Sequence, residues 1–459
     1  MSSLNWPSLT SELVRHLQEL IKRDTTNPPG NEMLAVEYLA GVLKAEGIEP
    51  IVFESAPKRG NLVARLKGTG EAPPLLLYGH TDVVPAEPQY WTHPPFAGEA
   101  ADGFVWGRGA VDMKGTVAQQ LVVFLTLKRE DAPLKRDVIF TATADEEIGG
   151  EDSPGLLWLV KHHPNLIRAE FGLTESGGYN RDFGGKRLYP IQVAEKGTCW
   201  LKMRARGKPG HASRPRDDNA VVRLARAIDR LATRGLPYHL CDAAAGFLDA
   251  ASTAVGGALG ETLQQLKSPE GAAQVLTDGS RRPESYRTLY AMLHNTATPT
   301  GLSAGLQTNV IPSVAEAVID GRTLPGFDAE SFLAEMKAVV GEGFEFEVLN
   351  VSPPLQTRHD TPLFALMAET LKRYDPEARV VPDMMVGATD AKYLARLGVP
   401  SYGFAPLQLP PGLDFDSLFH VHDERTPIAG LGWGVRVLYD VVKEYCSLTP
   451  SAFGGLPLS

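Results

Sequence analysis

Hydrophobic and polar positions are arranged in two different ways along the chain, and the arrangement changes near residue 197. Before this point, short apolar runs predict strands buried in a sheet, and longer stretches with helical spacing lie between them. The strands are expected at 61–66, 74–78, 139–144 and 169–174, and the helices at 8–23, 31–46, 113–129 and 154–162. Alternation of strand and helix is typical of an α/β domain with a mostly parallel sheet.

The region from 198 to 352 has a different pattern. Three segments alternate apolar and polar residues, which predicts strands with one face open to water, and two amphipathic helices accompany them. The strands are expected at 198–206, 313–320 and 343–351, and the helices at 219–234 and 328–340. An extra segment near 236–300 is poorly patterned, and we interpret it as an insertion of helices and loops.

The α/β pattern resumes after Pro353 and Pro354, with helices expected at 361–374, 389–397 and 427–445. The predicted fold class is therefore α/β, a mostly parallel-sheet domain interrupted by an inserted α+β module. The predicted boundaries are 1–197 and 353–459 for the first domain and 198–352 for the module.

Composition narrows the class of protein. The net charge of −10 argues against a nucleic-acid-binding protein, because phosphate contacts require a basic surface. Three cysteines cannot build a disulfide framework, which favours a reducing compartment. The N-terminal residues lack the pattern of a signal peptide, and no apolar run is long enough to span a bilayer. We predict a cytoplasmic protein with neither a nucleic-acid nor a membrane partner.

Polar residues follow the predicted buried strands, where ligands of parallel sheets bind. Taken singly, each has a structural interpretation as a turn residue, a helix cap or a solvated acidic turn. Their recurrence at successive strand ends instead favours one shared site. The candidates are His80 and Asp82, Asp112 before a helix, Glu146 and Glu147, Glu175, and either His420 or His422.

This set of side chains suits a pair of metal ions. Two histidines and three carboxylates can hold two divalent ions with one carboxylate bridging them, which leaves one glutamate as a general base. We expect zinc, with cobalt or manganese as alternatives, because such sites accept several metals. The turn at 387–390, which opens a predicted helix, offers backbone N–H groups to an anion.

At this point the chain resembles the M20 metallopeptidase family, which includes glutamate carboxypeptidases, aminoacylases, acetylornithine deacetylase and succinyl-diaminopimelate desuccinylase. The matching stretches run from about residue 20 to the end of the chain. They are RDTTNPPGNE (23–32), LLLYGHTDVVP (75–85), WGRGAVDMKG (106–115), TATADEEIGG (141–150), LTESGG (173–178), GKPGHASRP (207–215), TNVIPSVAEAVIDGR (308–322), GATDAKYL (387–394) and HVHDE (420–424).

The resemblance implies a role for each metal ligand. His80 and Glu175 would bind one ion, Glu147 and His420 would bind the other, and Asp112 would bridge both. The peptide bond that follows Asp112 is expected to be cis. The family motif favours His420 over His422 as the ligand.

The resemblance also implies the remaining site residues. Glu146 would be the general base and Asp82 would orient His80. His211 resembles the histidine that contacts the tetrahedral intermediate, often across a dimer interface. Asn309 and Arg322 resemble residues of the lid domain that hold a substrate carboxylate. The substrate-binding loop would contain Gly387, Thr389 and Asp390.

The predicted function is hydrolysis of an amide bond in a small carboxylate-bearing substrate, either a dipeptide, a C-terminal residue or an N-acyl amino acid. A homodimer through the lid module is expected, although the extra segment near 236–300 could block it and leaves open whether His211 acts in cis or in trans. Two alternatives stay open from the sequence. One is a two-metal phosphoesterase, and the other is a non-catalytic binding protein on the same scaffold.

Overall fold

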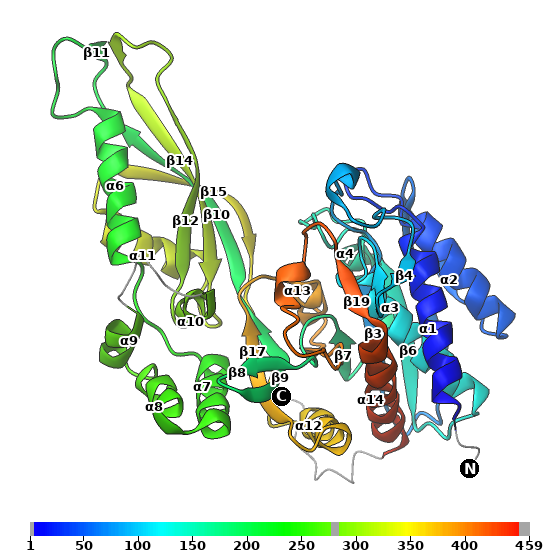
Figure 1. Ribbon diagram of the computed structural model, residues 1–459. Coiled ribbons are helices and arrows are strands. Elements are labelled where there is room, and N and C mark those ends of the chain that lie inside the picture. Colours follow the sequence, from blue (N-terminus) through cyan, green and yellow to red (C-terminus); the bar gives the residue numbers. More distant parts are fainter. Residues whose placement is uncertain (1–3, 277–283, 449–459) are drawn as a thin grey trace. The chain divides into compact units, whose positions relative to one another are not determined.

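The computed structural model describes residues 4–276 and 284–448, which divide into two compact units (Figure 1). Unit 1 contains the residues up to 193, together with 357–382 and those from 393 onward. Unit 2 contains Ala194–Gln356 and Asp383–Lys392. The turn at 387–390 therefore groups with unit 2.

Unit 1 is built on a twisted sheet in the order β1-β2-β6-β3-β7-β18-β9. Its four central strands, β6, β3, β7 and β18, are parallel, whereas the outer pairs are antiparallel. The predicted α/β class with a mostly parallel central sheet is confirmed. The strands of this sheet are β1 (Ile51–Ala56), β2 (Arg59–Leu66), β3 (Ala72–His80), β6 (Arg136–Thr143), β7 (Phe171–Thr174), β8 (Arg181–Phe183), β9 (Lys186–Glu195), β17 (Arg379–Met385) and β18 (Ser401–Gly403). A separate three-stranded sheet consists of β4 (Glu99–Ala101), β5 (Phe104–Trp106) and β19 (Arg425–Pro427).

Helices cover both faces of this sheet. On one face α3 packs against β3 and against α1 and α14, and nearly every residue of α3 is buried. On the other face α4 places its leucines against β2, β3 and β6, which buries both sides of the central strands. The helices are α1 (Trp6–Ile21), α2 (Met33–Ala45), α3 (Lys114–Arg129), α4 (Leu156–His162), α5 (Pro164–Ile167), α12 (Pro362–Tyr374), α13 (Ala391–Ala395) and α14 (Ile428–Ser447), with 3₁₀ turns at Pro88–Tyr90 and Asp416–Leu418.

Unit 2 contains a four-stranded antiparallel sheet in the order β12-β14-β10-β15. One face packs on α6 and α11, and the other carries exposed residues, as the alternating pattern predicts. The elements are β10 (Gly197–Arg206), β11 (Gly210–His211), α6 (Ala220–Arg234), α7 (Asp242–Val255), α8 (Gly257–Gln265), α9 (Pro269–Leu276), α10 (Glu284–Leu293), β12 (Thr296–Ala304), β13 (Val310–Ile311), β14 (Val314–Thr323), α11 (Ala329–Val340), β15 (Phe344–Ser352) and β16 (Leu355–Gln356).

The extra segment near 236–300 folds into α7, α8, α9 and α10, followed by the first part of β12. Strands β9 and β17 were not predicted. Each contains a proline, Pro190 or Pro382, and a proline argues against a strand because it cannot donate a ladder hydrogen bond. Among the described residues, no helix has the length and apolar character that crossing a membrane would require.

Candidate metal centre

Three parallel strands of unit 1 deliver polar side chains to one edge of the sheet. Strand β3 lies between β6 and β7 and ends at His80. The acidic segment that contains Glu146 and Glu147 follows β6, and Glu175 follows β7. Since the carboxyl ends of parallel strands meet at the same edge, these side chains converge.

Asp112 lies at the centre of the cluster, between two histidines. Its Oδ1 is 3.1 Å from Nε2 of His80, and its Oδ2 is 3.0 Å from Nε2 of His420. Nε2 of His420 is also 3.1 Å from Oε2 of Glu147, and Nε2 of His80 is 3.7 Å from Oε2 of Glu175. The arrangement forms two groups of donor atoms that share one carboxylate. The peptide bond from Asp112 to Met113 is cis, as expected.

Glu146 belongs to the same cluster. One oxygen of its carboxylate lies within 4.8 Å of donor atoms of His80 and Glu175. Donor atoms of His80, Asp112 and Glu147 lie equally close to one another. A carboxylate next to a shared donor group is placed to exchange a proton with a molecule bound there.

The carboxylates of the cluster are buried next to one another. Burial and the charge of Asp112 raise the pKa of Glu175 to about 8, and burial also raises the pKa of Glu147. Burial acts in the same direction on Asp112, but its hydrogen bonds with His420 and His80 outweigh burial and lower its pKa. The same contacts with Asp112 and Glu147 raise the pKa of His420 to about 10.

This donor set fits divalent cations. Oε1 of Glu147 is buried without a hydrogen-bond partner among the described residues, although carboxylate oxygens are normally satisfied inside proteins. The grouped carboxylates need more positive charge than two imidazoles provide, and bound cations supply such charge. Imidazole and carboxylate are ligands of zinc and of related metals.

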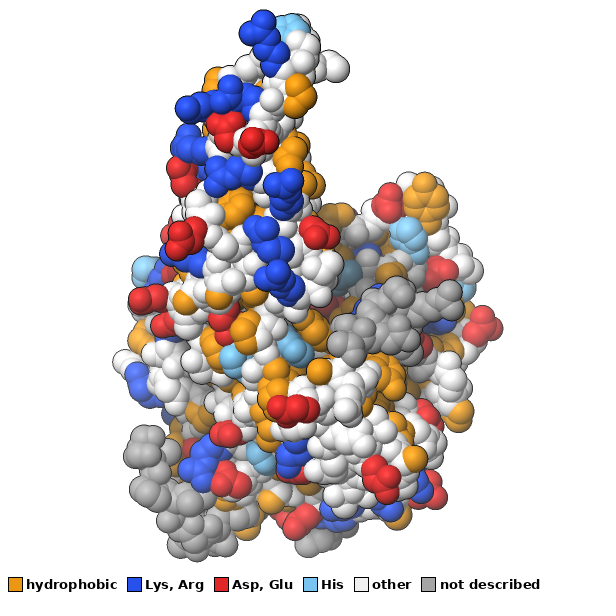
Figure 2. All heavy atoms as spheres, turned by 90° about the vertical axis from the view of Figure 1, so that its left-hand side faces the viewer, with side chains coloured by type: hydrophobic (Ala, Val, Ile, Leu, Met, Phe, Trp, Pro, Cys, Tyr) orange, Lys and Arg blue, Asp and Glu red, His pale blue; other side chains and the backbone are white. Residues whose placement is uncertain are grey.

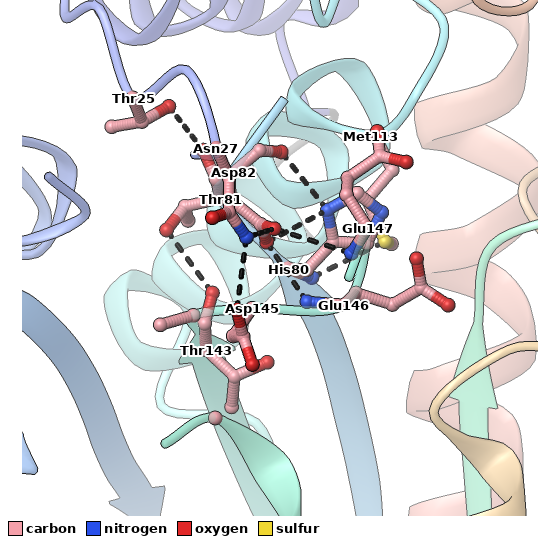
Figure 3. Close-up of polar contacts among 12 residues, drawn as sticks. Thr25, Asn27, His80, Thr81, Asp82, Met113, Thr143, Asp145, Glu146 and Glu147 are labelled. Atoms are coloured by element: carbon pink, nitrogen blue, oxygen red, sulfur yellow. Dashed lines mark hydrogen bonds and ion pairs between the residues drawn. The ribbon is translucent and has the colours of Figure 1, made fainter. Parts of the chain in front are cut away.

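Asp82 contacts His80 and the backbone of Glu146 and Glu147 (Figure 3). Nδ1 of His80 lies 3.0 Å from the backbone oxygen of Asp82 and 3.4 Å from its Oδ1. The Asp82 carboxylate also accepts hydrogen bonds from the backbone N–H groups of Glu146, at 3.1 Å, and Glu147, at 3.2 Å. Asp82 thus contacts the histidine and the acidic segment together.

Two supporting residues were missed by the sequence interpretation, namely Glu424 and Arg108. Glu424 is fully buried and accepts hydrogen bonds from the backbone N–H groups of Val111, at 2.7 Å, and Asp112, at 3.1 Å. Arg108 donates to its other oxygen at 2.7 Å. This pair fixes the loop that presents Asp112. Both residues occur in motifs quoted above, but their mutual contact spans 316 positions, which no local pattern reveals.

His422 lies outside the cluster. It is exposed, and its Nε2 is 3.2 Å from Oε2 of Glu87. His420, two residues earlier, adopts a positive φ of 60° and directs its imidazole to Asp112. The geometry therefore distinguishes the two histidines in favour of His420.

The other predicted residues lie in unit 2, in two separate groups. His211 and Asn309 are exposed neighbours at the β11–β13 ribbon, where the N–H of Ala212 donates to the backbone oxygen of Asn309 at 3.0 Å. Arg322 lies eight residues beyond Val314 on β14, which is about 26 Å along an extended strand. The structure does not bring Asn309 and Arg322 together.

Arg322 is not free. Its Nε and Nη2 donate to the two oxygens of Asp320, at 2.7 and 3.1 Å. The predicted loop with Gly387 and Asp390 lies near the same end of β14 as Arg322. The first residues of β10 pair with this end of β14, and Glu195, which precedes β10, holds the loop. Oε2 of Glu195 accepts hydrogen bonds from the backbone N–H of Thr389, at 2.9 Å, and from its hydroxyl, at 2.7 Å.

Comparisons with known proteins point to one family. The model for peptidase family M20/M25/M40 matches residues 76–444. Pig aminoacylase-1 is 27% identical over 442 residues, which cover 94% of each chain. An M20 family metallo-carboxypeptidase from Sulfolobus solfataricus has a similar structure, with a TM-score of 0.69 and 20% identity over 95% of this chain and 100% of its own. A Bacillus subtilis protein described as a dinuclear metal-binding peptidase gives a TM-score of 0.58 and 16% identity over 96% and 99% of the chains.

Proposed function

Because this chain belongs to peptidase family M20/M25/M40, we propose that it hydrolyses the amide bond of a small carboxylate-bearing substrate, with Glu146 as general base. The enzyme acts on C–N bonds, as its aminoacylase and peptidase relatives do. The observation that carries the finer proposal is the placement of Asp112 between His80 and His420, with Glu146 beside them. The substrate is an N-acyl amino acid or a dipeptide.

Two divalent ions complete the site. His80, Asp112 and Glu175 would hold one, while Asp112, Glu147 and His420 would hold the other. When bound, such a pair lowers the pKa of water and polarises a carbonyl group. Zinc is the expected metal, with cobalt or manganese as alternatives.

Proton transfer falls to Glu146. Its carboxylate accepts a proton from the attacking water and returns it to the nitrogen of the leaving amine, so that one group serves as base and then as acid. Asp82 keeps the backbone of Glu146 in place through the hydrogen bond at 3.1 Å. The base is therefore held by a buried group that does not itself contact substrate.

Substrate recognition falls to unit 2. Arg322 would pair with the substrate carboxylate, and Asp320 fixes the plane of its guanidinium through two hydrogen bonds. The loop with Gly387, Thr389 and Asp390 would contact the substrate from the same end of the sheet. Asn309 lies too far along the strand to share this task on the same chain.

His211 would stabilise the oxyanion of the intermediate, and we propose that it comes from a second copy of the chain. The separation of His211 from Arg322 along β14 exceeds the size of a dipeptide. One substrate molecule therefore cannot contact both residues of one chain. Subunit mixing tests this, because copies carrying His211→Ala and copies carrying Glu146→Gln would regain activity together only if His211 acts in trans.

A substrate panel tests the proposed function. The protein loaded with zinc, cobalt or manganese is offered N-acetyl amino acids, longer N-acyl amino acids and dipeptides, and amine release is measured. Each substrate is paired with its C-terminal carboxamide, which lacks the negative charge. We expect cleavage that a chelator abolishes, with at least about a tenfold preference for the carboxylate form. Hydrolysis of phosphate esters without cleavage of any amide would overturn the proposal.

A further inference from the structure

We propose that Asn27 is a positioning residue of the metal centre, because its side-chain amide joins the buried carboxylates of Asp82 and Asp145 and thereby fixes Asp82. This inference deepens the proposed function and rests on it. Within the described parts of the chain, the side-chain amide of Asn27 donates to Asp82 and Asp145 and to none of the proposed metal ligands, so its effect on the metal centre passes through Asp82. Figure 3 shows Asn27, Asp82 and Asp145 in this arrangement.

The chain holds Asn27 firmly against the end of β3. The backbone N–H of Asn27 donates to the oxygen of Val83 at 2.8 Å, and the N–H of Val83 donates to the oxygen of Thr25 at 3.2 Å. The hydroxyl of Thr25 donates to the backbone oxygen of Thr81 at 2.5 Å. The segment 25–27 therefore runs alongside 81–83, and the Asn27 side chain projects toward the carboxylates.

The amide nitrogen of Asn27 serves two acceptors. Nδ2 lies 2.8 Å from Oδ2 of Asp82 and 3.0 Å from Oδ1 of Asp145. An amide NH₂ group has two hydrogens, so each carboxylate can receive one. The orientation of the amide follows from this contact, because its oxygen could not face two carboxylate oxygens without repulsion. Asn27 is 2% exposed and Asp82 is fully buried.

The oxygen of the same amide is left unsatisfied. Oδ1 of Asn27 is buried and has no hydrogen-bond partner among the described residues. A buried polar atom without a partner destabilises the fold, so the oxygen is not the reason for an asparagine here. What an asparagine brings to this position is a neutral donor for two negative groups.

Fixing Asp82 matters because its carboxylate faces several groups of the site. Oδ1 accepts the backbone N–H of Glu146 and faces Nδ1 of His80 at 3.4 Å. Oδ2 accepts the hydrogen bond from Asn27 and that from the backbone N–H of Glu147, at 3.2 Å. A rotation of Asp82 would therefore move the general base, one ligand segment and the imidazole of His80 together.

Asp145 is held on its other side by Arg59. Nη2 of Arg59 lies 2.8 Å from Oδ1 of Asp145, and the same guanidinium binds both oxygens of Glu32 at 2.7 and 2.8 Å. Asp145 therefore contacts an arginine, which it shares with Glu32, whereas Asp82 depends on neutral donors and on His80. A third carboxylate at position 27 would consequently repel Asp82 most strongly.

The test compares three substitutions that separate volume, donor and charge. Asn27→Leu keeps a branched side chain, somewhat larger than asparagine, and removes the donor. Asn27→Ala removes both the bulk and the donor, and Asn27→Asp keeps the shape but adds a negative charge. The measurements are the visible spectrum and the stoichiometry of bound cobalt, together with kcat and KM. For Leu and Ala we expect a similar shift of the cobalt spectrum and a fall in kcat of about 10–100-fold with little change in KM. Asn27→Asp is expected to shift the cobalt spectrum further and to lower kcat more than either of the other two substitutions.

Asn295 provides a matched control in unit 2. It is also fully buried, and its amide donates to Oε2 of Glu335 at 2.8 Å. Asn295→Leu and Asn295→Asp should lower thermal stability and leave the cobalt spectrum unchanged.

Two results would overturn the inference. One is a cobalt spectrum and kcat for Asn27→Asp closer to the unsubstituted protein than those of Asn27→Ala, since this would show that only shape matters. The other is an Asn27→Leu protein with an unchanged spectrum, which decides the question even if Asn27→Asp fails to fold. A protein that binds cobalt but cleaves no amide would refute the proposed function while leaving the spectral comparison valid.

Discussion

The donors at the strand ends of unit 1 and the predicted residues His211, Asn309 and Arg322 of unit 2 lie in different environments. In unit 1, His80, Glu147 and Glu175 lie at or just after the ends of parallel strands, and the His80 side chain is 1% exposed. His420 reaches Asp112 from a loop, and about half of its side chain is exposed. In unit 2, His211 and Asn309 are exposed at one end of the sheet, and Arg322 is ion-paired at the other. Figure 2 shows Lys and Arg side chains interspersed with Asp and Glu on the face of unit 2 that it draws. Among the ion pairs of unit 2 is that of Arg204 with Glu316, whose side chains are both partly exposed.

The difference shows which groups the fold itself organises. Carboxylates buried beside one another are costly, so their arrangement in unit 1 requires compensating charge and a rigid frame. Exposed or ion-paired groups in unit 2 carry no such requirement, and their function depends on a substrate or on a second copy of the chain. Substitutions among the donors of unit 1 should therefore affect metal content and chemistry. In unit 2, substitutions near Arg322 should affect substrate binding, and only His211 is expected to affect the chemical step.

The largest effect is expected for Glu146→Gln. The amide keeps the size of the side chain but cannot accept a proton, so kcat should fall by about 10²–10⁴-fold. Bound metal, measured by elemental analysis after dialysis, should stay at two ions per chain. Near-normal turnover with full metal content would remove Glu146 from the role of base.

His420 and His422 form a natural pair for the second prediction. His420→Ala removes a donor that lies 3.0 Å from Asp112, so we expect the metal content to fall from two ions to about one and kcat to fall by about 100-fold or more. His422→Ala should change both values by less than about twofold, because His422 faces Glu87 at the surface. Equal effects of the two substitutions would contradict the assignment of His420.

The third prediction concerns recognition in unit 2. Arg322→Lys keeps the positive charge but loses the planar fork, so KM for carboxylate-bearing substrates should rise by about tenfold while kcat changes little. Asp320→Asn should raise KM in the same direction and by a smaller factor, because the guanidinium loses its charged partner. The carboxamide substrates serve as a control, since their KM should not respond to either change. A fall in kcat with constant KM would place Arg322 in the chemical step instead.

The two units also differ in how much of their structure and candidate site the sequence predicted. Apolar runs predicted the buried strands, and the ends of these strands predicted where His80 and Glu175 would lie. The sequence could not reveal the contact of Glu424 with Arg108, or the amide of Asn27 between two carboxylates, because such contacts join residues far apart in the chain.

In unit 2 the sequence did not reveal how far apart Asn309 and Arg322 lie in space. Asn309 and Arg322 belong to one continuous motif, but an extended strand carries them apart. Motif resemblance groups residues by their order in the chain, and the geometry of the strand separates them in space.

The smallest effect is expected for Glu195→Gln, which changes the pH dependence of stability. This prediction tests unit 2 without a substrate. Burial raises its pKa to about 7, against the two hydrogen bonds from Thr389. Because this pKa exceeds the ordinary value of 4.5, the stabilisation associated with the neutral carboxyl group is present below pH 4.5 and is lost as the pH rises through 7. Glu195→Gln cannot ionise at this position, so its free energy of unfolding, obtained from urea titrations, should decline less between pH 5 and 8, by a difference of at most about 3 kcal/mol. The exposed Glu261→Gln serves as a control and should leave the decline as it is. An identical decline in Glu195→Gln would mean that Glu195 is ionised in the folded protein throughout this range, and the loop at Thr389 would then be held by a carboxylate rather than by a carboxylic acid.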